Sequence, residues 1–182
     1  KNIVSEFENQ YEMAKTLELT YVEFRRLKKY CDKKRILFLS TPDEFKSAKF
    51  LYDLQDIFKI GSGEITNLPF LSYIGSFKKQ IILSTGMSKL QEIRDAVEIL
   101  VSSGTKYKDI TVLHCTSEYP APIDELNLST IKTLKERYNC EVGYSGHEFR
   151  LSTSVAATYL GASVIERHVT LDKSMWGSDQ LS

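Results

Sequence analysis

Two histidines, His147 and His168, each follow an apolar run, in "EVGYSGHE" and "SVIERHVT". Neutral imidazoles from neighbouring strands can bind one divalent ion and leave its other positions to water or substrate. Because two histidines are too few for a closed structural zinc site, the pattern favours an open site for Mn²⁺ or a similar ion acting as a Lewis acid. The alternative is a pair of core histidines that are hydrogen-bonded to the backbone.

Glu166 and Arg167 directly precede His168, so the last apolar run contains three ionisable side chains in succession. A buried strand needs a partner for each of them, because an unpaired charge is costly in an apolar environment. Glu166 could orient an imidazole from behind, or it could form a buried ion pair with Arg167 or with a lysine.

A second group of candidate site residues begins in "FKIGSGE", residues 58–64. Lys59 lies in an apolar strand, where an unpaired ammonium would be costly, and a glycine-rich turn with Ser62 follows it. The amides and the hydroxyl of such a turn can bind an anion. Further hydroxyl groups stand at other predicted strand ends: Thr41, Ser84 and Ser145. Together these residues predict a phosphate or carboxylate pocket.

The segment "LDKSMWGSDQ", residues 171–180, reads as a loop just beyond the last strand. It carries Asp172 and Asp179, either of which could reach a substrate hydroxyl if the loop overhangs the site. Solvated loop residues are the alternative interpretation.

The overall composition excludes several classes of protein. The chain has 182 residues with 24 basic and 24 acidic side chains, which gives no support for binding nucleic acid or a polybasic membrane surface. No apolar run approaches the roughly 20 residues of a membrane span, and no signal-peptide pattern opens the sequence. Cys31, Cys115 and Cys140 form no CxxC pair, which favours reduced thiols in a cytoplasmic protein.

Predicted helices and strands alternate along the chain, which is expected to form a single, partial barrel domain over residues 1–182. The expected strands lie within residues 35–41, 57–64, 80–86, 110–122, 140–148 and 163–170. The expected helices are 20–34, 42–54, 67–77, 88–103, 128–138 and 150–162. Capping is expected from Thr20 with Glu23 in the first helix and from Ser88 with Gln91 in the fourth. Six strands interleaved with helices indicate a parallel sheet covered by helices.

Every predicted strand ends in polar or glycine residues. The carboxyl ends of parallel strands share one rim, where α/β proteins build their sites. Two architectures fit: a (β/α)₈ barrel that lacks some units, or an open doubly wound sheet. Because all six ends are polar, the closed barrel is favoured. A barrel normally needs about 250 residues, so about two βα units are expected to be missing, most plausibly upstream.

The motifs "FLSTP", "KIGSGEITN", "ILSTGM", "LHCTSEYPAP", "GYSGHE" and "IERHVTLDKSMWGSD" resemble, in this order, those of the sialic acid synthase family. The resemblance implies a (β/α)₈ barrel of which strands 3 to 8 are present. It implies a transferase that condenses phosphoenolpyruvate with N-acetylmannosamine or a related aldehyde sugar and releases phosphate by C–O cleavage. The metal, Mn²⁺ or Mg²⁺, would be held by His147 and His168.

The resemblance also implies roles for further residues. The phosphoenolpyruvate contacts would be Thr41, Lys59, Ser62, Ser84 and Ser145. Ser117 would be another substrate contact, at a position that is Asn in some members. Glu64, Tyr119 and Asp179 would be the sugar-side and acid–base residues. Lys59 would share in catalysis by holding phosphoenolpyruvate, with Glu64 and Asp179 transferring protons.

Some features of the family lie outside this sequence. The first two strands, with a Glu and a Lys–Phe–Gln motif, and a C-terminal antifreeze-like domain are not present. That domain lends an Arg to the partner subunit, which implies a homodimer and an inactive fragment. Gly146 stands where many relatives have Asp, which leaves the identity of the sugar open.

Two other functions remain possible from the sequence. Lys59 could act as the Schiff-base nucleophile of a barrel aldolase, which would need no metal. The barrel could instead bind a sugar or a phosphate without catalysing a reaction.

Overall fold

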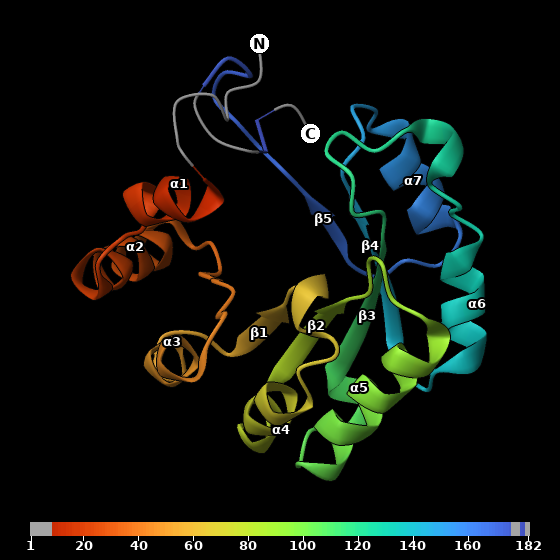
Figure 1. Ribbon diagram of the computed structural model, residues 1–182, viewed down its shortest axis with the longest axis horizontal. Helices are drawn as coiled ribbons and strands as arrows, with labels where there is room; N and C mark the ends of the chain where they lie inside the picture. Colours follow the sequence, from red (N-terminus) through yellow and green to blue (C-terminus); the bar gives the residue numbers. More distant parts are fainter. Residues whose placement is uncertain (1–8, 176–178, 181–182) are drawn as a thin grey trace.

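The computed structural model describes residues 9–175 and 179–180 (Figure 1). Its strands are β1 (Ile57–Ile60), β2 (Gln80–Ser84), β3 (Ile110–Cys115), β4 (Glu141–Gly146) and β5 (Ile165–Arg167). Its helices are α1 (Gln10–Leu17), α2 (Tyr21–Lys34), α3 (Phe45–Leu51), α4 (Leu68–Ser76), α5 (Leu90–Ser102), α6 (Thr130–Arg137) and α7 (Ser152–Tyr159). None of the helices in the described ranges combines the length and the apolar character needed to cross a bilayer.

The sheet decides between the two predicted architectures. Its five described strands are all parallel and lie in chain order, β1-β2-β3-β4-β5, with no reversal of direction along the sheet. A doubly wound sheet would reverse its strand order at a switch point, whereas a barrel adds each strand to the same edge. The strands therefore form a curled part of a (β/α)₈ barrel, and the prediction of that fold is confirmed.

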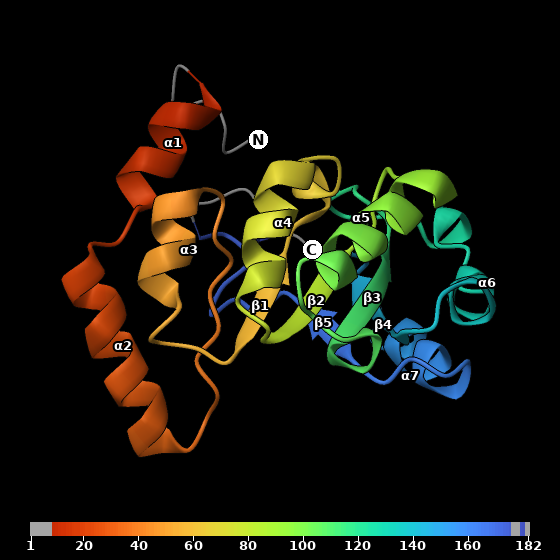
Figure 2. The same cartoon turned by 90° about the horizontal axis from the view of Figure 1, so that it is seen from below.

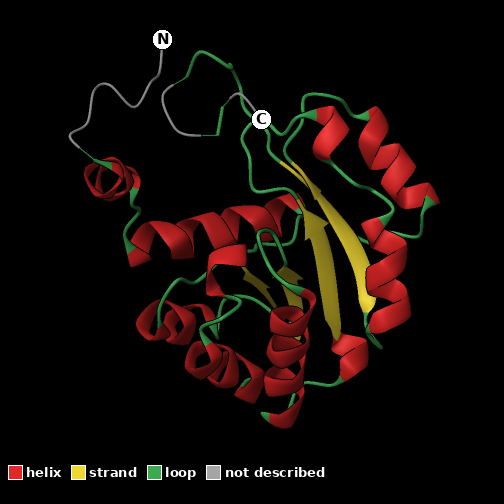
Figure 3. Cartoon of the chain, turned by 45° about the vertical axis from the view of Figure 1, so that its right-hand side comes forward, coloured by secondary structure: helices red, strands yellow, loops and turns green. Residues whose placement is uncertain are grey.

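Helices cover the outer side of this curled sheet. Figure 2 shows α3 to α7 following one another in an arc outside the strands, and Figure 3 shows the strands in yellow against these helices. Successive strand residues point to opposite faces, so alternate residues such as Phe58 and Ile60 of β1 pack into the core beneath the helices. Lys59, between them, faces the inside of the curled sheet. The same alternation buries Val142 and Tyr144 of β4 on the helix side.

One predicted strand is absent from the sheet. Residues 35–41 were expected to be a strand, but residues 36–41 have no regular structure, and Ile36 and Leu37 are exposed. A strand is stabilised by the ladder it forms with its neighbours, and the described part of the sheet offers this segment no such ladder. Instead, the buried Gln55 side chain accepts a hydrogen bond from the Ser40 backbone N–H and donates one to the Ser40 carbonyl, both at 2.9 Å.

The helix ends agree with the sequence in one case and differ in another. Thr20 caps α2 in a capping box with Glu23, as predicted. The predicted cap of α5 by Ser88 and Gln91 is wrong, because the N-cap residue is Lys89, one position later than expected. The Lys89 backbone N–H donates to the Glu92 carboxylate at 2.7 Å, while the Ser88 hydroxyl donates to the Gly86 carbonyl in the preceding loop.

The double hydrogen bond of Gln55 holds the segment that carries Thr41. We predict that Gln55→Leu in the full-length protein lowers the free energy of unfolding by about 1–2 kcal/mol, because two hydrogen bonds worth about 1 kcal/mol each are lost. Urea denaturation measures the change. Gln91→Ala is the control, since its amide donates to the exposed Asp95 carboxylate on the same helix. Equal costs in the two variants would show that Gln55 does not hold this segment.

Candidate functional site

A cavity of about 480 Å³ opens at the carboxyl ends of the strands. Nine of the eleven predicted site residues line it: Thr41, Lys59, Ser62, Ser84, Ser117, Tyr119, Ser145, His147 and His168. They come from segments spread over more than a hundred positions of the chain, and the shared rim of the parallel strands brings them together. The lining also includes Cys115 and Glu166, which were not among the predicted site residues.

The strand register places three cavity residues side by side. Cys115 of β3 pairs with Ser145 of β4, and Ser145 pairs with Glu166 of β5. Residues paired across parallel strands point to the same face, so all three side chains turn inward at one level of the barrel. Two residues further along the chain, Ser117, His147 and His168 line the mouth of the same cavity.

Glu166 joins the two predicted halves of the site. Its Oε1 accepts a hydrogen bond from the Ser145 hydroxyl at 2.7 Å, and its Oε2 lies 3.5 Å from the Lys59 ammonium. Lys59 is only 8% exposed, so its charge would be costly without this partner. Of the two alternatives for Glu166, the ion pair with a lysine is the one that the structure contains.

His147 is held as a neutral imidazole with an open nitrogen. Its Nδ1 lies 2.6 Å from the Thr116 carbonyl oxygen, which can only accept, so Nδ1 carries the proton and Nε2 has a lone pair. Ser145 lies 3.3 Å from Nε2, but its one proton goes to the closer, charged Glu166. Burial, together with the nearby His168, lowers the pKa of His147, while the Thr116 carbonyl opposes that shift. Among the residues that the structure describes, no other group donates a hydrogen bond to this lone pair.

The second imidazole lies close to the first. The ring centroids of His147 and His168 are 5.2 Å apart, with the rings nearly perpendicular. Two imidazoles bound side by side to one ion, with metal–nitrogen distances near 2.1 Å, have centroids roughly 5 Å apart. Tyr119 stacks on His147 at 4.1 Å and meets the edge of His168 at 5.6 Å. Asp179 Oδ2 lies 3.7 Å from Nδ1 of His168, on the side away from Nε2.

These donors fit an open metal site. The unprotonated Nε2 of His147 and the neighbouring ring of His168 could supply two nitrogen ligands to a metal ion. Several coordination positions of that ion would remain for water and substrate. In the parts of the chain that the structure describes, no group of three or more His, Cys, Asp or Glu side chains is arranged to hold a metal ion. The donor set is therefore unlike that of a closed structural site, and the metal stays a prediction.

The other half of the cavity is rich in hydroxyl groups. The Gly86 backbone N–H donates to the Ser62 hydroxyl at 2.8 Å, which links the loops after β1 and β2. A Cβ atom at position 86 would lie 2.1 Å from the Ser117 hydroxyl oxygen, so any other residue there would displace this hydroxyl from its place in the cavity. Lys59 lies at the base of this half, and an anion held here would meet one ammonium and several hydroxyl donors.

Two predicted acid–base residues do not line the cavity. Glu64 lies in a short 3₁₀ turn (Ser62–Glu64), and its carboxylate accepts a hydrogen bond from the Asn67 amide at 2.7 Å. It also faces Asp43, whose pKa is raised by burial and by the Glu64 charge. Asp179 reaches the site through His168. The roles of Glu64 and Asp179 stay predictions.

Two residues that the site uses, Cys115 and Gly86, were not identified as site residues from the sequence, and Glu166 was considered only as a partner of other side chains. Cys115 and Glu166 could have been assigned to the cavity from the two-residue period of a strand, since they lie two residues before Ser117 and His168. The signal for Gly86 was its place in "STGM", directly after a strand. The remaining strand histidine, His114, points the other way and its Nε2 lies 2.6 Å from the Leu126 carbonyl oxygen, as expected of a core histidine.

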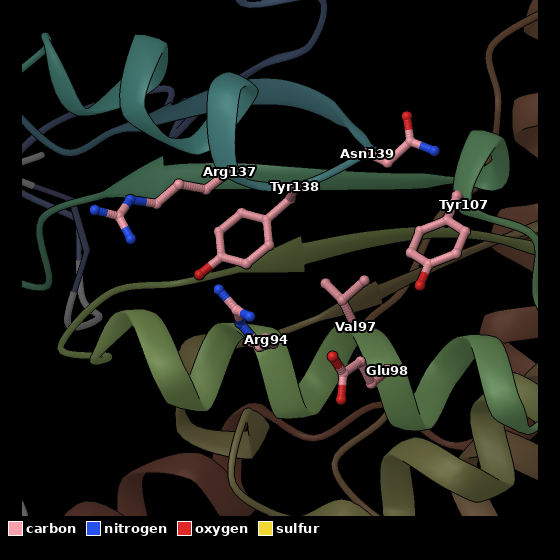
Figure 4. A pocket seen from close by; sticks show the side chains of 7 residues that line it. All are labelled: Arg94, Val97, Glu98, Tyr107, Arg137, Tyr138 and Asn139. Atoms are coloured by element: carbon pink, nitrogen blue, oxygen red, sulfur yellow. The ribbon is translucent and has the colours of Figure 1, made fainter.

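A second hollow lies on the outside of the helix layer. It is lined by Arg94, Val97, Glu98, Tyr107, Arg137, Tyr138 and Asn139, between α5 and the end of α6 (Figure 4). The Tyr138 hydroxyl donates to the Leu90 carbonyl at 2.5 Å, which ties the two helices together. None of the predicted site residues is near it, so the cavity at the strand ends is the candidate functional site.

Comparison with known proteins gives a consistent set of matches. A family model described as the NeuB family matches residues 1–182. The chain is 49% identical over 173 residues to N,N'-diacetyllegionaminic acid synthase of Campylobacter jejuni, covering 94% of this chain and 52% of that protein. It is 40% identical over 185 residues to the synthase of the same name from Legionella pneumophila, covering 100% of this chain and 52% of that protein. The chain thus spans about half the length of these curated relatives.

A solved structure agrees with the sequence matches. The N-acetylneuraminic acid (sialic acid) synthetase from Leptospira borgpetersenii, crystallised in complex with citrate, superposes with a TM-score of 0.89 at 33% identity. The alignment covers 99% of this chain and 64% of that one. The fold of this chain is therefore shared, nearly over its whole length, with a structure of that name.

The ion pair of Lys59 with Glu166 gives a prediction about stability. Breaking a fully buried pair costs about 3–5 kcal/mol, but the Glu166 side chain is 36% exposed, so we expect Glu166→Gln to cost about 1–2 kcal/mol. Urea denaturation of the full-length protein at pH 7 measures it. Asp56→Asn is the matched control, because Asp56 lies 3.6 Å from Lys79 with a fully exposed side chain. A loss in Glu166→Gln no larger than in the control would show that Lys59 does not depend on Glu166.

Proposed function

The chain belongs to the NeuB family, and we propose that it synthesises a nonulosonic acid of the sialic acid type from phosphoenolpyruvate and an aldehyde amino sugar. One observation carries this proposal. Two neighbouring imidazoles and an anion pocket built from an ammonium and several hydroxyl groups line the same cavity. A condensation between an anionic enol phosphate and an aldehyde needs both halves in contact.

Phosphoenolpyruvate would lie in the hydroxyl-rich half. Lys59 supplies a positive charge, and Thr41, Ser62 and Ser84 supply donors for the phosphate and carboxylate oxygens. Because Glu166 already balances the Lys59 charge, a bound anion would share the ammonium with this carboxylate. Hydroxyl groups then matter more here than they would beside an unpaired lysine.

The aldehyde sugar would lie in the half with the two histidines. Nε2 of His147 and the ring of His168 would hold the ion, Mn²⁺ or Mg²⁺. A bound divalent ion would supply Lewis-acid polarisation of the aldehyde oxygen. The Thr116 carbonyl keeps the proton of His147 on Nδ1, and Asp179 faces Nδ1 of His168, so both rings would present Nε2. Tyr119, stacked on His147, would form one wall of the sugar subsite.

In the proposed reaction, the methylene carbon of phosphoenolpyruvate bonds to the aldehyde carbon of the sugar, and the aldehyde oxygen becomes a hydroxyl group. Water adds to the central carbon of the enolpyruvate unit. The C–O bond to the phosphate then breaks, and the bridging oxygen leaves with the phosphate. The products are a nonulosonic acid and inorganic phosphate, with one water consumed.

The proton transfers need groups close to the reacting atoms. Asp179 is the better supported of the two predicted acids, because it lies beside His168. Glu64 binds Asn67 and would have to turn toward the cavity to take part. Burial, followed by the charges of Asp179, Cys115 and Glu166, raises the pKa of Tyr119, so its hydroxyl stays protonated and can donate a hydrogen bond to the sugar.

The names of the relatives bear on the identity of the acceptor sugar. Two relatives are named for N,N'-diacetyllegionaminic acid, which favours an acceptor carrying two acetamido groups over N-acetylmannosamine. The homodimer, the cytoplasmic location and the need for segments beyond these 182 residues stay predictions.

The aldolase alternative is disfavoured by the site. A Schiff-base lysine must attack as a free amine, but Lys59 is paired with the Glu166 carboxylate. The pairing favours a role in binding an anion over a role as nucleophile.

The function is tested by assaying phosphate release from the full-length protein with phosphoenolpyruvate, Mn²⁺ and single acceptor sugars. We expect release only with an acceptor, and faster with a diacetamido sugar than with N-acetylmannosamine. With ¹⁸O in the bridging position, mass spectrometry should find the label in phosphate, as C–O cleavage requires. Label retained in the sugar product, or trapping of Lys59 by borohydride with pyruvate, would contradict the proposal.

The metal ligands can be tested without the reaction. His147→Ala and His168→Ala should each weaken Mn²⁺ binding at least about tenfold, measured by electron paramagnetic resonance of free Mn²⁺. His114→Asn is the control, since this histidine is buried like His147 but binds the Leu126 carbonyl on the other face of the sheet. Mn²⁺ binding that falls as much in the control as in the two variants would remove the pair from the ligand set.

A further inference from the structure

A fully buried carboxylate lies behind the cavity and takes no part in the proposed reaction. Glu148 is 0% exposed and forms an ion pair with Arg167. Its carboxylate also accepts hydrogen bonds from the Tyr144 hydroxyl, at 2.9 Å, and from the Thr153 hydroxyl in the first turn of α7. Arg167 donates through Nη1 to this carboxylate and through Nη2 to the Glu148 backbone carbonyl.

The two opposite charges of this pair balance, and both Glu148 carboxylate oxygens accept hydrogen bonds. Burial alone would raise the pKa of Glu148, but the Thr153, backbone and Tyr144 hydrogen bonds and the Arg167 charge outweigh it and lower that pKa. An isolated charge at this depth would be strongly destabilising, so each partner requires the other. The pair is therefore a rigid connection between the end of β4 and the end of β5.

The position of this connection relates it to the two imidazoles. Glu148 directly follows His147, and Arg167 directly precedes His168. Gly146, before His147, is the register partner of Arg167. We propose that Glu148 and Arg167 are positioning residues that set the separation of His147 and His168 and thereby their affinity for a divalent ion. This inference rests on the metal pair of the proposed function.

The absence of a side chain at Gly146 leaves room for the Glu148 carboxylate beside Arg167. A Cβ atom at position 146 would lie 2.3 Å from Arg167 Nη1, 2.8 Å from Cε1 of the Tyr144 ring and 3.0 Å from Glu148 Oε1. A side chain on residue 146 would therefore have to displace the guanidinium and the Tyr144 ring and would compete with the Glu148 carboxylate for this space. A carboxylate on residue 146 would reach the same guanidinium, but the two acids cannot both occupy this space. Gly146 is not among the positive-φ residues, so an aspartate is compatible with its backbone.

This geometry allows two kinds of variant: one that removes the carboxylate beside Arg167, and one that supplies it from residue 146 instead. Glu148→Ala should leave Arg167 unpaired and raise the Kd for Mn²⁺ about tenfold or more. Glu148→Gln keeps the size and most hydrogen bonds but removes the charge, and it replaces the alanine variant if that one does not fold. The double variant Gly146→Asp with Glu148→Ala restores a carboxylate beside Arg167 and should recover Mn²⁺ affinity to within about threefold of wild type. Gly146→Asp alone should be impaired.

The test uses the full-length protein and two measurements. Electron paramagnetic resonance gives the Kd for Mn²⁺, and thermal unfolding without metal gives stability. Thr105→Val is the stability control, because its buried hydroxyl binds the Gly75 carbonyl, away from the cavity. A merely structural role predicts that Mn²⁺ affinity follows stability alone in all variants. That result, or a double variant no better than Glu148→Ala, would overturn the proposal.

A crystal structure of Glu148→Gln separates this inference from the proposed function. If wild-type protein binds no Mn²⁺, the metal site of the proposed function fails. The positioning role is then decided by the two imidazole rings. Rings displaced from their wild-type separation would support it, and rings that stay in place would overturn it.

Discussion

The site depends on the contacts of the Glu166 carboxylate with Ser145 and Lys59. One carboxylate oxygen takes the proton of Ser145 and the other balances the buried ammonium of Lys59. Because Ser145 gives its proton away, Nε2 of His147 keeps an unshared lone pair directed at the cavity. A single carboxylate thus keeps a buried cation stable in the anion pocket and an open ligand in the imidazole half.

The parallel register makes this arrangement possible and explains three ionisable residues in one short strand. Because side chains alternate along β5, Glu166 points into the cavity and Arg167 points to the opposite face, where it forms an ion pair with Glu148. The two acids and the two cations are therefore sorted into separate pairs, one on each face of the sheet. His168 then follows at the strand end and meets His147.

Much of the fold was predictable because it rests on local patterns. Alternating strands and helices with polar strand ends predicted the barrel and most residues of the cavity, including Lys59 and both histidines. The remainder depends on contacts that a local pattern does not contain. Residues 36–41 form no strand because the described sheet gives them no ladder, and Glu64 turns to Asn67 within its own 3₁₀ turn. The pair of Glu148 with Arg167 joins a loop to a strand 19 residues away, with no signal in either segment.

The proposed function requires that two imidazoles hold one divalent ion beside the anion pocket. A crystal of the full-length protein soaked in Mn²⁺, with data collected for anomalous scattering, tests this most directly. We expect one anomalous peak within about 2.0–2.4 Å of Nε2 of both His147 and His168, next to the cavity half that holds Lys59. A peak bound elsewhere, or bound to only one of the two rings, would contradict it.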